Sequence, residues 1–196
     1  MPPCALGGDL GPMTPNGQIL NNPVTGERVK WHLTSADTEG RLVRAEWWAR
    51  PGGGVTFEHV HREAEERFEV LAGHMAAELD GRRVDLGAGE RIALPAGIPH
   101  RWWNSGGDDL HFLVEIEPPG HFEQTIETLF GLARESRVKG DGSPDLLQLA
   151  VMARAFGLEA YPTSPPLPVL RAAAAVLAPL GRALGRRATY PRFSGQ

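Results

Sequence analysis

The chain of 196 residues contains a single cysteine, Cys4, so no disulfide can form within it. A lone cysteine is typical of proteins that work in a reducing compartment. No Lys or Arg precedes Arg28, and the first residues lack an apolar core of signal-peptide length, so we expect a cytoplasmic protein. The longest apolar run, Ala172–Ala178, is far too short to span a membrane.

Acidic residues are missing from the end of the chain. The formal net charge is −4, which gives no general attraction to nucleic acid, and we predict no nucleic-acid partner. From Pro168 to Gln196, however, every charged side chain is an arginine. Arg171, Arg182 and Arg186 either form a solvated basic face or offer a surface to an anionic partner or membrane.

Turn-forming residues are abundant, with 24 glycines and 17 prolines. Many short strands joined by turns require this composition. Between residues 19 and 117 the segments are short and rich in Val, Trp and Phe, and Asp80-Gly81 between two of them is a type I′ hairpin signal. We therefore predict an all-β core over residues 19–117, preceded by a flexible arm over residues 1–18.

The apolar spacing changes to that of helices after the core. Phe122, Ile126 and Phe130 recur at intervals of four residues and predict one helix. Another helix is predicted from residue 169 to residue 184, with a kink at Pro179 because proline lacks the backbone N–H of a helix interior.

A middle helix has its own start and stop signals. Ser143 is the expected N-cap, Pro144 the first helical residue, and Gly157 the stop. The segment Tyr161–Pro168 contains four prolines and is predicted to be an extended linker. Residues 118–196 are thus interpreted as an α-helical extension that packs on the β core.

Histidines at two places in the β region suit a metal ion. His59 and His61 are separated by one residue, so both imidazoles project from the same face of a strand. His100 follows a turn rich in proline and glycine. A carboxylate is available from Glu63, Glu65 and Glu66. Neutral imidazoles with one carboxylate suit Fe, Mn, Ni, Co, Cu or Zn.

These two places resemble the two signature motifs of the cupin superfamily. The pattern GxxxxxHxHxxxxExxxxxxG is matched by Gly53, His59, His61, Glu66 and Gly73. The pattern GxxxxxPxGxxHxxxN is matched by Gly89, Pro95, Gly97, His100 and Asn104. The resemblance implies a cupin jelly-roll barrel, or double-stranded β-helix, over residues 19–117, with one metal ion bound by all three histidines and Glu66. The family spacing to Gly73 favours Glu66 over Glu65.

Strand alternation also predicts which side chains surround this ion. Trp102 shares the face of His100, Phe68 shares the face of Glu66, and Phe57 shares the face of the first two histidines. We name Phe57, Phe68 and Trp102 as candidate substrate-binding residues, while Trp102 can equally be ordinary core packing. Such a pocket suits a small, partly apolar or aromatic ligand.

Four protein ligands on an octahedral metal leave two neighbouring positions for a substrate or dioxygen. The resemblance to quercetinase-like cupins implies an Fe(II) or Mn(II) oxygenase in which Glu66 is both ligand and catalytic base; Ni, Zn, Co and Cu also fit the ligand set. Two alternatives stay open, because fold and ligands do not name a reaction. One is a non-redox lyase, isomerase or cyclase. The other is a non-catalytic cupin that binds a small ligand.

The outer faces of the predicted barrel raise the question of assembly. Exposed sheet edges and apolar outer faces are usually covered by pairing or by helices. We predict a homodimer, as is common among cupins, with Trp103, Trp47 or Trp48 and part of the C-terminal extension as contacts.

Overall fold

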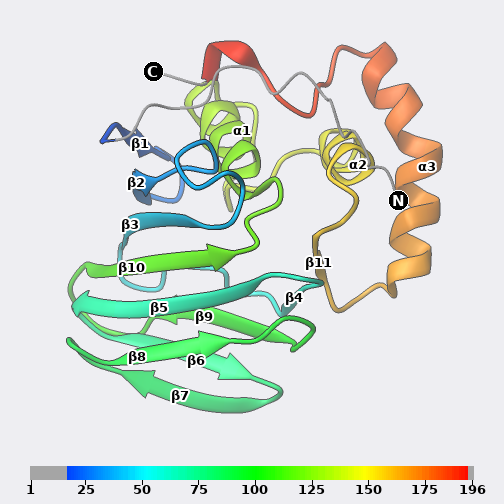
Figure 1. Cartoon of the computed structure of the whole chain (residues 1–196). Helices are drawn as coiled ribbons and strands as arrows, with labels where there is room; N and C mark the ends of the chain where they lie inside the picture. The colour runs from blue at the N-terminus through cyan, green and yellow to red at the C-terminus, as the bar shows by residue number, and fades with distance from the viewer. Residues whose placement is uncertain (1–16, 194–196) are drawn as a thin grey trace.

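The computed structural model describes residues 17–193 (Figure 1). Residues 1–16 of the predicted arm lie outside the described residues. The strands are β1 (Ile19–Asn21), β2 (Arg28–Leu33), β3 (Val43–Ala49), β4 (His59–His61), β5 (Glu65–Ala72), β6 (Met75–Leu79), β7 (Arg82–Leu86), β8 (Arg91–Leu94), β9 (His100–Asn104), β10 (Leu110–Glu117) and β11 (Ala160–Pro162). The helices are α1 (Phe122–Arg134), α2 (Leu146–Ala155), α3 (Leu167–Ala183) and a 3₁₀ turn, η1 (Pro191–Phe193).

The strands form two antiparallel sheets. One has the order β1-β2-β3-β10-β5-β8, and the other has the order β11-β4-β9-β6-β7. Figure 1 shows the helices gathered at one side of these sheets, with α2 and α3 beyond α1. The predicted fold class, a jelly-roll β core with a helical C-terminal extension, is confirmed.

Local turn chemistry fixes one hairpin of the second sheet. Asp80 and Gly81 join β6 to β7 with φ angles of 47° and 73°. A type I′ turn requires positive φ at both central residues, which glycine adopts freely and aspartate tolerates. The hairpin predicted at this dipeptide is therefore confirmed.

The barrel core is aromatic, and α1 closes one end of it. Trp47 is buried beside Phe130 of α1, with ring centroids 6.0 Å apart, and Trp31 lies edge-on to Phe122 at 6.1 Å. Ile126 belongs to the same cluster. The residues that predicted the first helix are thus part of the barrel core.

The extension differs from its prediction in two details. The N-cap of α2 is Asp145, whose side chain accepts a hydrogen bond from the N–H of Gln148 at 2.8 Å. Ser143 lies two residues earlier, before Pro144, which forms an isolated bridge with Val138, so the predicted N-cap was wrong by two residues. An Asp or Ser satisfies helix N–H groups equally well, and the sequence therefore offered two starts.

Helix α3 has apolar side chains on two faces. Ala174, Ala178 and Gly181 are buried, and α3 packs along α2. The opposite side exposes four large apolar residues: Val169, Val176, Leu180 and Leu184. Pro179 lies inside the helix, which continues to Ala183. No helix among residues 17–193 is long and apolar enough to cross a bilayer.

The last described residues of the extension pack against its first helix, α1. Phe193 packs with Leu132 and Tyr190 in a small second cluster. Its ring lies directly over Gly131 of α1, where an added Cβ would be 2.1 Å from the ring. A glycine inside a helix costs stability, and here it makes room for this aromatic contact.

Candidate metal centre

Both sheets contribute to one buried polar cluster. His59 and His61 project from β4, His100 begins β9, and Glu66 lies on β5 in the other sheet. One ligand atom from each residue can be chosen so that all four lie within 4.8 Å of one another, and all four residues are buried. A single divalent ion could therefore contact all four side chains, as the motif spacing predicts.

The structure distinguishes the two competing glutamates. Glu66 is 4% exposed, and its Oε1 lies 3.5 Å from Nε2 of His61. Glu65 points to the other face of β5, where its carboxylate accepts a hydrogen bond from Arg67 at 2.7 Å. The alternation of a strand explains this outcome, since neighbouring residues cannot share a face. The choice of Glu66 from the family spacing agrees with this placement.

Backbone carbonyls orient two of the imidazoles. Nδ1 of His100 lies 2.8 Å from the carbonyl of Ile98, and Nδ1 of His59 lies 3.3 Å from the carbonyl of Phe57. A carbonyl only accepts, so both Nδ1 atoms carry the proton. Nε2 is then the ring atom that can bind a metal in both residues, which is the usual arrangement around metal-binding histidines.

Two atoms of the cluster lack the hydrogen bonds that burial normally requires. Oε2 of Glu66 and Nε2 of His100 face each other at 3.2 Å as an ion pair, but this contact lacks hydrogen-bond geometry, and neither atom has another hydrogen-bond partner among the described residues. A buried polar atom left unpaired costs free energy. A metal ion bound to both atoms would remove that cost, so the residues fit a metal.

Burial and mutual charge set the protonation of the cluster. Burial lowers the pKa of His59 to about 4 and also lowers the pKa of His61. Burial acts to raise the pKa of Glu66, but the three histidines outweigh it and hold that pKa below its usual value. Burial acts to lower the pKa of His100, but the Glu66 carboxylate outweighs it and raises that pKa. One carboxylate and two neutral imidazoles are thus ready for a cation at neutral pH.

The affinity for a divalent metal should therefore fall as the pH is lowered. A metal binds the neutral imidazole, so it must displace the proton that the raised pKa of His100 retains. One competing proton lowers the apparent affinity about tenfold for each pH unit below that pKa. Calorimetry with Co²⁺ in buffers of different ionisation enthalpy should show proton release on binding. An affinity that does not change with pH would contradict this assignment.

The three predicted substrate-binding residues lie in different surroundings. Trp102 and Phe68 are buried in the aromatic core with ring centroids 5.9 Å apart. Each lies two residues beyond a ligand on its strand, about 7 Å along the barrel. Phe57 precedes β4, is 59% exposed and has its ring 5.6 Å from that of His59. Phe57 alone of the three is accessible from outside, and a role in substrate binding remains a prediction for all three.

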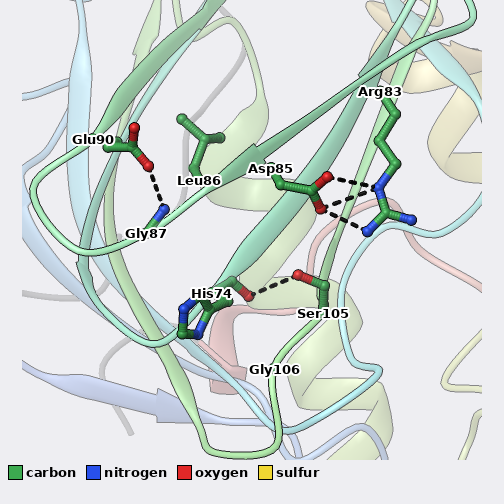
Figure 2. A pocket seen from close by; sticks show the side chains of 8 residues that line it. All are labelled: His74, Arg83, Asp85, Leu86, Gly87, Glu90, Ser105 and Gly106. Atoms are coloured by element: carbon green, nitrogen blue, oxygen red, sulfur yellow. Dashed lines mark hydrogen bonds and ion pairs between the residues drawn. The ribbon is translucent and has the colours of Figure 1, made fainter.

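A surface hollow of about 560 Å³ lies elsewhere on the same sheet (Figure 2). Its lining includes His74, Ser105 and the ion pair of Arg83 with Asp85. Ser105 follows the last residue of β9, whereas His100 is its first residue, so the two residues are about 17 Å apart along the strand. This hollow is therefore not the entrance to the metal cluster.

Sequence reasoning missed the strand β11. Ala160, Tyr161 and Pro162 pair with His61, Val60 and His59 of β4. The segment Tyr161–Pro168 was interpreted as a linker because of its prolines. That interpretation was wrong for Tyr161 and Pro162, which are in β11, and for Leu167 and Pro168, which begin α3. A three-residue strand that includes proline has no alternating pattern, so no local signal marks it.

The fold and the buried His₃Glu cluster define a jelly-roll protein with a candidate metal centre. Residues 47–116 match the family model described as the cupin domain. They contain all four residues of the cluster and both signature motifs. This part of the chain is therefore a cupin domain, as the motifs predicted.

The chain resembles known proteins over part of its length. Polyketide synthase CurC of Streptomyces cyaneus is 30% identical over 69 residues, which are 35% of this chain and 44% of that protein. An uncharacterised protein of Methanocaldococcus jannaschii is 32% identical over 75 residues, which are 38% of this chain and 60% of that protein. The chain thus spans about half the length of these curated relatives. The solved polyketide cyclase RemF of Streptomyces resistomycificus is 32% identical, with 47% of this chain and 65% of that chain covered at a TM-score of 0.41.

Proposed function

We propose that this cupin is a metal-dependent enzyme that acts on a small, partly apolar or aromatic substrate, and that its reaction is an oxygenation. The observation that supports this proposal is the buried cluster of four potential ligands, in which the facing atoms Glu66 Oε2 and His100 Nε2 have no hydrogen bond to any other group among the described residues. A divalent transition metal, with Fe or Mn favoured, would supply Lewis acidity and access to dioxygen chemistry there. A cytoplasmic, reducing setting is part of this proposal, since it keeps Fe in the divalent state.

The protein groups have separate tasks in this proposal. His59, His61 and His100 hold the metal through Nε2, with two of the rings fixed by backbone carbonyls. Glu66 is a ligand and also the base that accepts a substrate proton on its carboxylate, because the surrounding histidines keep it ionised by lowering its pKa. Phe57 offers an aromatic surface at the exposed side of His59 for the substrate.

A second candidate reaction is the cyclisation of a polyketide-derived chain. The relative in Streptomyces cyaneus is named a polyketide synthase, and that name favours a substrate with several carbonyl groups. A metal that polarises a carbonyl and a carboxylate that removes a proton are sufficient for such ring closure. This reaction needs no oxidant, so dioxygen separates the two candidates.

The test is an oxygen-uptake screen on protein loaded separately with Fe²⁺, Mn²⁺, Co²⁺, Ni²⁺ or Zn²⁺. Catechols, flavonols and β-diketones are the substrates, and each reaction is repeated without oxygen. Oxygen consumption matched by oxygen in the product supports the oxygenase. Turnover that persists without oxygen supports the cyclase, and substrate binding without turnover under any metal would overturn the enzyme proposal.

We also propose a homodimer. The candidate contact Trp47 was wrong, because this side chain is 5% exposed within the barrel core. Trp48 stacks on His111 at the barrel surface, and the Trp103 ring has the guanidinium groups of Arg83 and Arg101 each 5.5 Å from its centroid. The exposed apolar face of α3, with Val176 at 74% exposure, is the stronger candidate for burial between two copies.

Light scattering should accordingly give a particle of twice the 21.2 kDa of one chain. Val176→Glu would place a charge in the centre of the α3 face and should shift the particle toward the single-chain mass. A wild-type particle of 21.2 kDa at micromolar concentration would contradict the dimer.

A further inference from the structure

The strand that carries two of the four candidate ligands is short. β4 contains three residues, and it has one ladder pair with β9, His59 opposite His100. On that side the carbonyl of His61 also accepts a hydrogen bond from the N–H of Gly97 at 2.7 Å. Strands with so few partners open readily unless something else holds them.

The other edge of β4 is fully paired by β11 of the C-terminal extension. Figure 1 shows β11 running between α2 and β4. The N–H of Arg62 donates to the carbonyl of Glu159 at 2.8 Å, and the N–H of Thr163 donates to the carbonyl of Glu58 at 3.2 Å. Residues 159–163 therefore bracket the whole of β4, and we call this segment the β11 clamp.

The register explains why a proline is tolerated in the β11 clamp. Hydrogen-bonded and non-hydrogen-bonded pairs alternate along an antiparallel ladder. The bonds at Glu159 and Thr163 make Tyr161 opposite Val60 the hydrogen-bonded pair between them. Pro162 then occupies a non-hydrogen-bonded position, where the ladder needs no N–H.

A side-chain contact anchors the clamp to the barrel-packed helix α1. The Glu159 carboxylate accepts a hydrogen bond from the backbone N–H of His121 and also contacts Nδ1 of the same residue, both at 2.7 Å. The His121 ring stacks on Phe156 with centroids 4.9 Å apart. A Cβ at Gly120 would lie 2.3 Å from this carboxylate, so glycine leaves the room that the contact needs.

We propose that the β11 clamp is a positioning element that holds His59 and His61 in metal-binding geometry. The proposal rests on the metal function proposed above. Metal affinity depends on ligands being held in place before the ion arrives, and outer contacts that do this are worth about 10- to 100-fold in affinity. The extension then contributes to metal binding by positioning two ligands, although none of its own residues is a candidate ligand.

The decisive experiment compares two substitutions at one position in the full chain. Tyr161→Pro removes the N–H that pairs with Val60, whereas Tyr161→Ala removes the side chain and keeps the N–H. We expect Tyr161→Pro to weaken Co²⁺ binding about tenfold or more and Tyr161→Ala to stay within about twofold of wild type. Hydrogen exchange of the peptide that contains β4 should rise only in Tyr161→Pro, and circular dichroism checks that each variant folds.

Glu159→Ala provides a second variant without a backbone change. It releases the anchor on His121 and should give a smaller loss of Co²⁺ affinity in the same direction. Folded Tyr161→Pro protein that binds Co²⁺ as tightly as wild type would overturn the clamp, and so would equal losses in Tyr161→Pro and Tyr161→Ala. Wild-type protein that binds no Co²⁺ would instead refute the metal function, while hydrogen exchange of β4 would still decide whether the clamp holds the strand.

Discussion

Glu66→Gln should lower the affinity for Co²⁺ by about a hundredfold or more, whereas Glu65→Gln should leave it unchanged. Glutamine has nearly the same shape as glutamate but no charge, so the buried cluster would lose its only anionic ligand. Glu66 is buried among the histidines, while Glu65 is paired with Arg67 on the outer face of the same strand. The two substitutions are therefore matched in chemistry and differ in the face of β5.

Isothermal titration with Co²⁺ measures this pair directly, and the visible absorption of bound Co²⁺ reports the coordination. Removing the buried charge also leaves the three histidines without their counter-ion, so the raised pKa of His100 should return toward lower values in Glu66→Gln. Wild-type Co²⁺ affinity in both variants would mean that neither carboxylate is a ligand. A loss in Glu65→Gln alone would show that the family spacing chose the wrong residue.

Cutting the chain after Glu117 should produce an aggregated or unfolded fragment. The cut removes α1, whose Phe122 and Phe130 lie on Trp31 and Trp47 of the barrel core. It also removes β11 and leaves the free edge of β4 open to pairing with other chains. Solubility and urea denaturation of the fragment test this expectation, and a soluble fragment that binds Co²⁺ like the full chain would contradict it.

Single substitutions in the full chain also test whether the C-terminal extension stabilises the barrel. Phe130→Ala should lower the free energy of unfolding by about 3 to 5 kcal/mol, since Phe130 is 3% exposed inside the aromatic cluster. Val176→Ala on the exposed face of α3 should change the stability of each chain by no more than about 0.5 kcal/mol. If the Phe130→Ala protein were as stable as the Val176→Ala protein, the packing of α1 on the barrel would contribute little to stability.

The barrel and the candidate ligands were predictable because their signals are local. His59 and His61 are one residue apart, and strand alternation alone places both rings on one face. Asp80-Gly81 permits the positive φ angles of its hairpin turn, as few other dipeptides do. The choice between Glu65 and Glu66 needed the family spacing, because the run of glutamates offers several carboxylates.

Contacts between distant segments could not be predicted in the same way. The register of β11 on β4 depends on where α1 and α2 place Glu159, and nothing in the three residues of β11 indicates a strand. For helix α3 the element could be predicted but its packing could not. Its sequence is apolar on nearly all sides, so periodicity identified a helix but could not say which face packs on α2 and which is exposed.

The most direct test of the central claim is the crystal structure of Co²⁺-loaded protein with anomalous scattering recorded at the cobalt edge. The account predicts one ion per chain, within about 2.0 to 2.3 Å of Nε2 of His59, His61 and His100 and of one carboxylate oxygen of Glu66. Glu65 should remain paired with Arg67, as it is in this structure. No ion at these four residues in crystals soaked with Co²⁺, or an ion bound elsewhere on the chain, would contradict the metal centre.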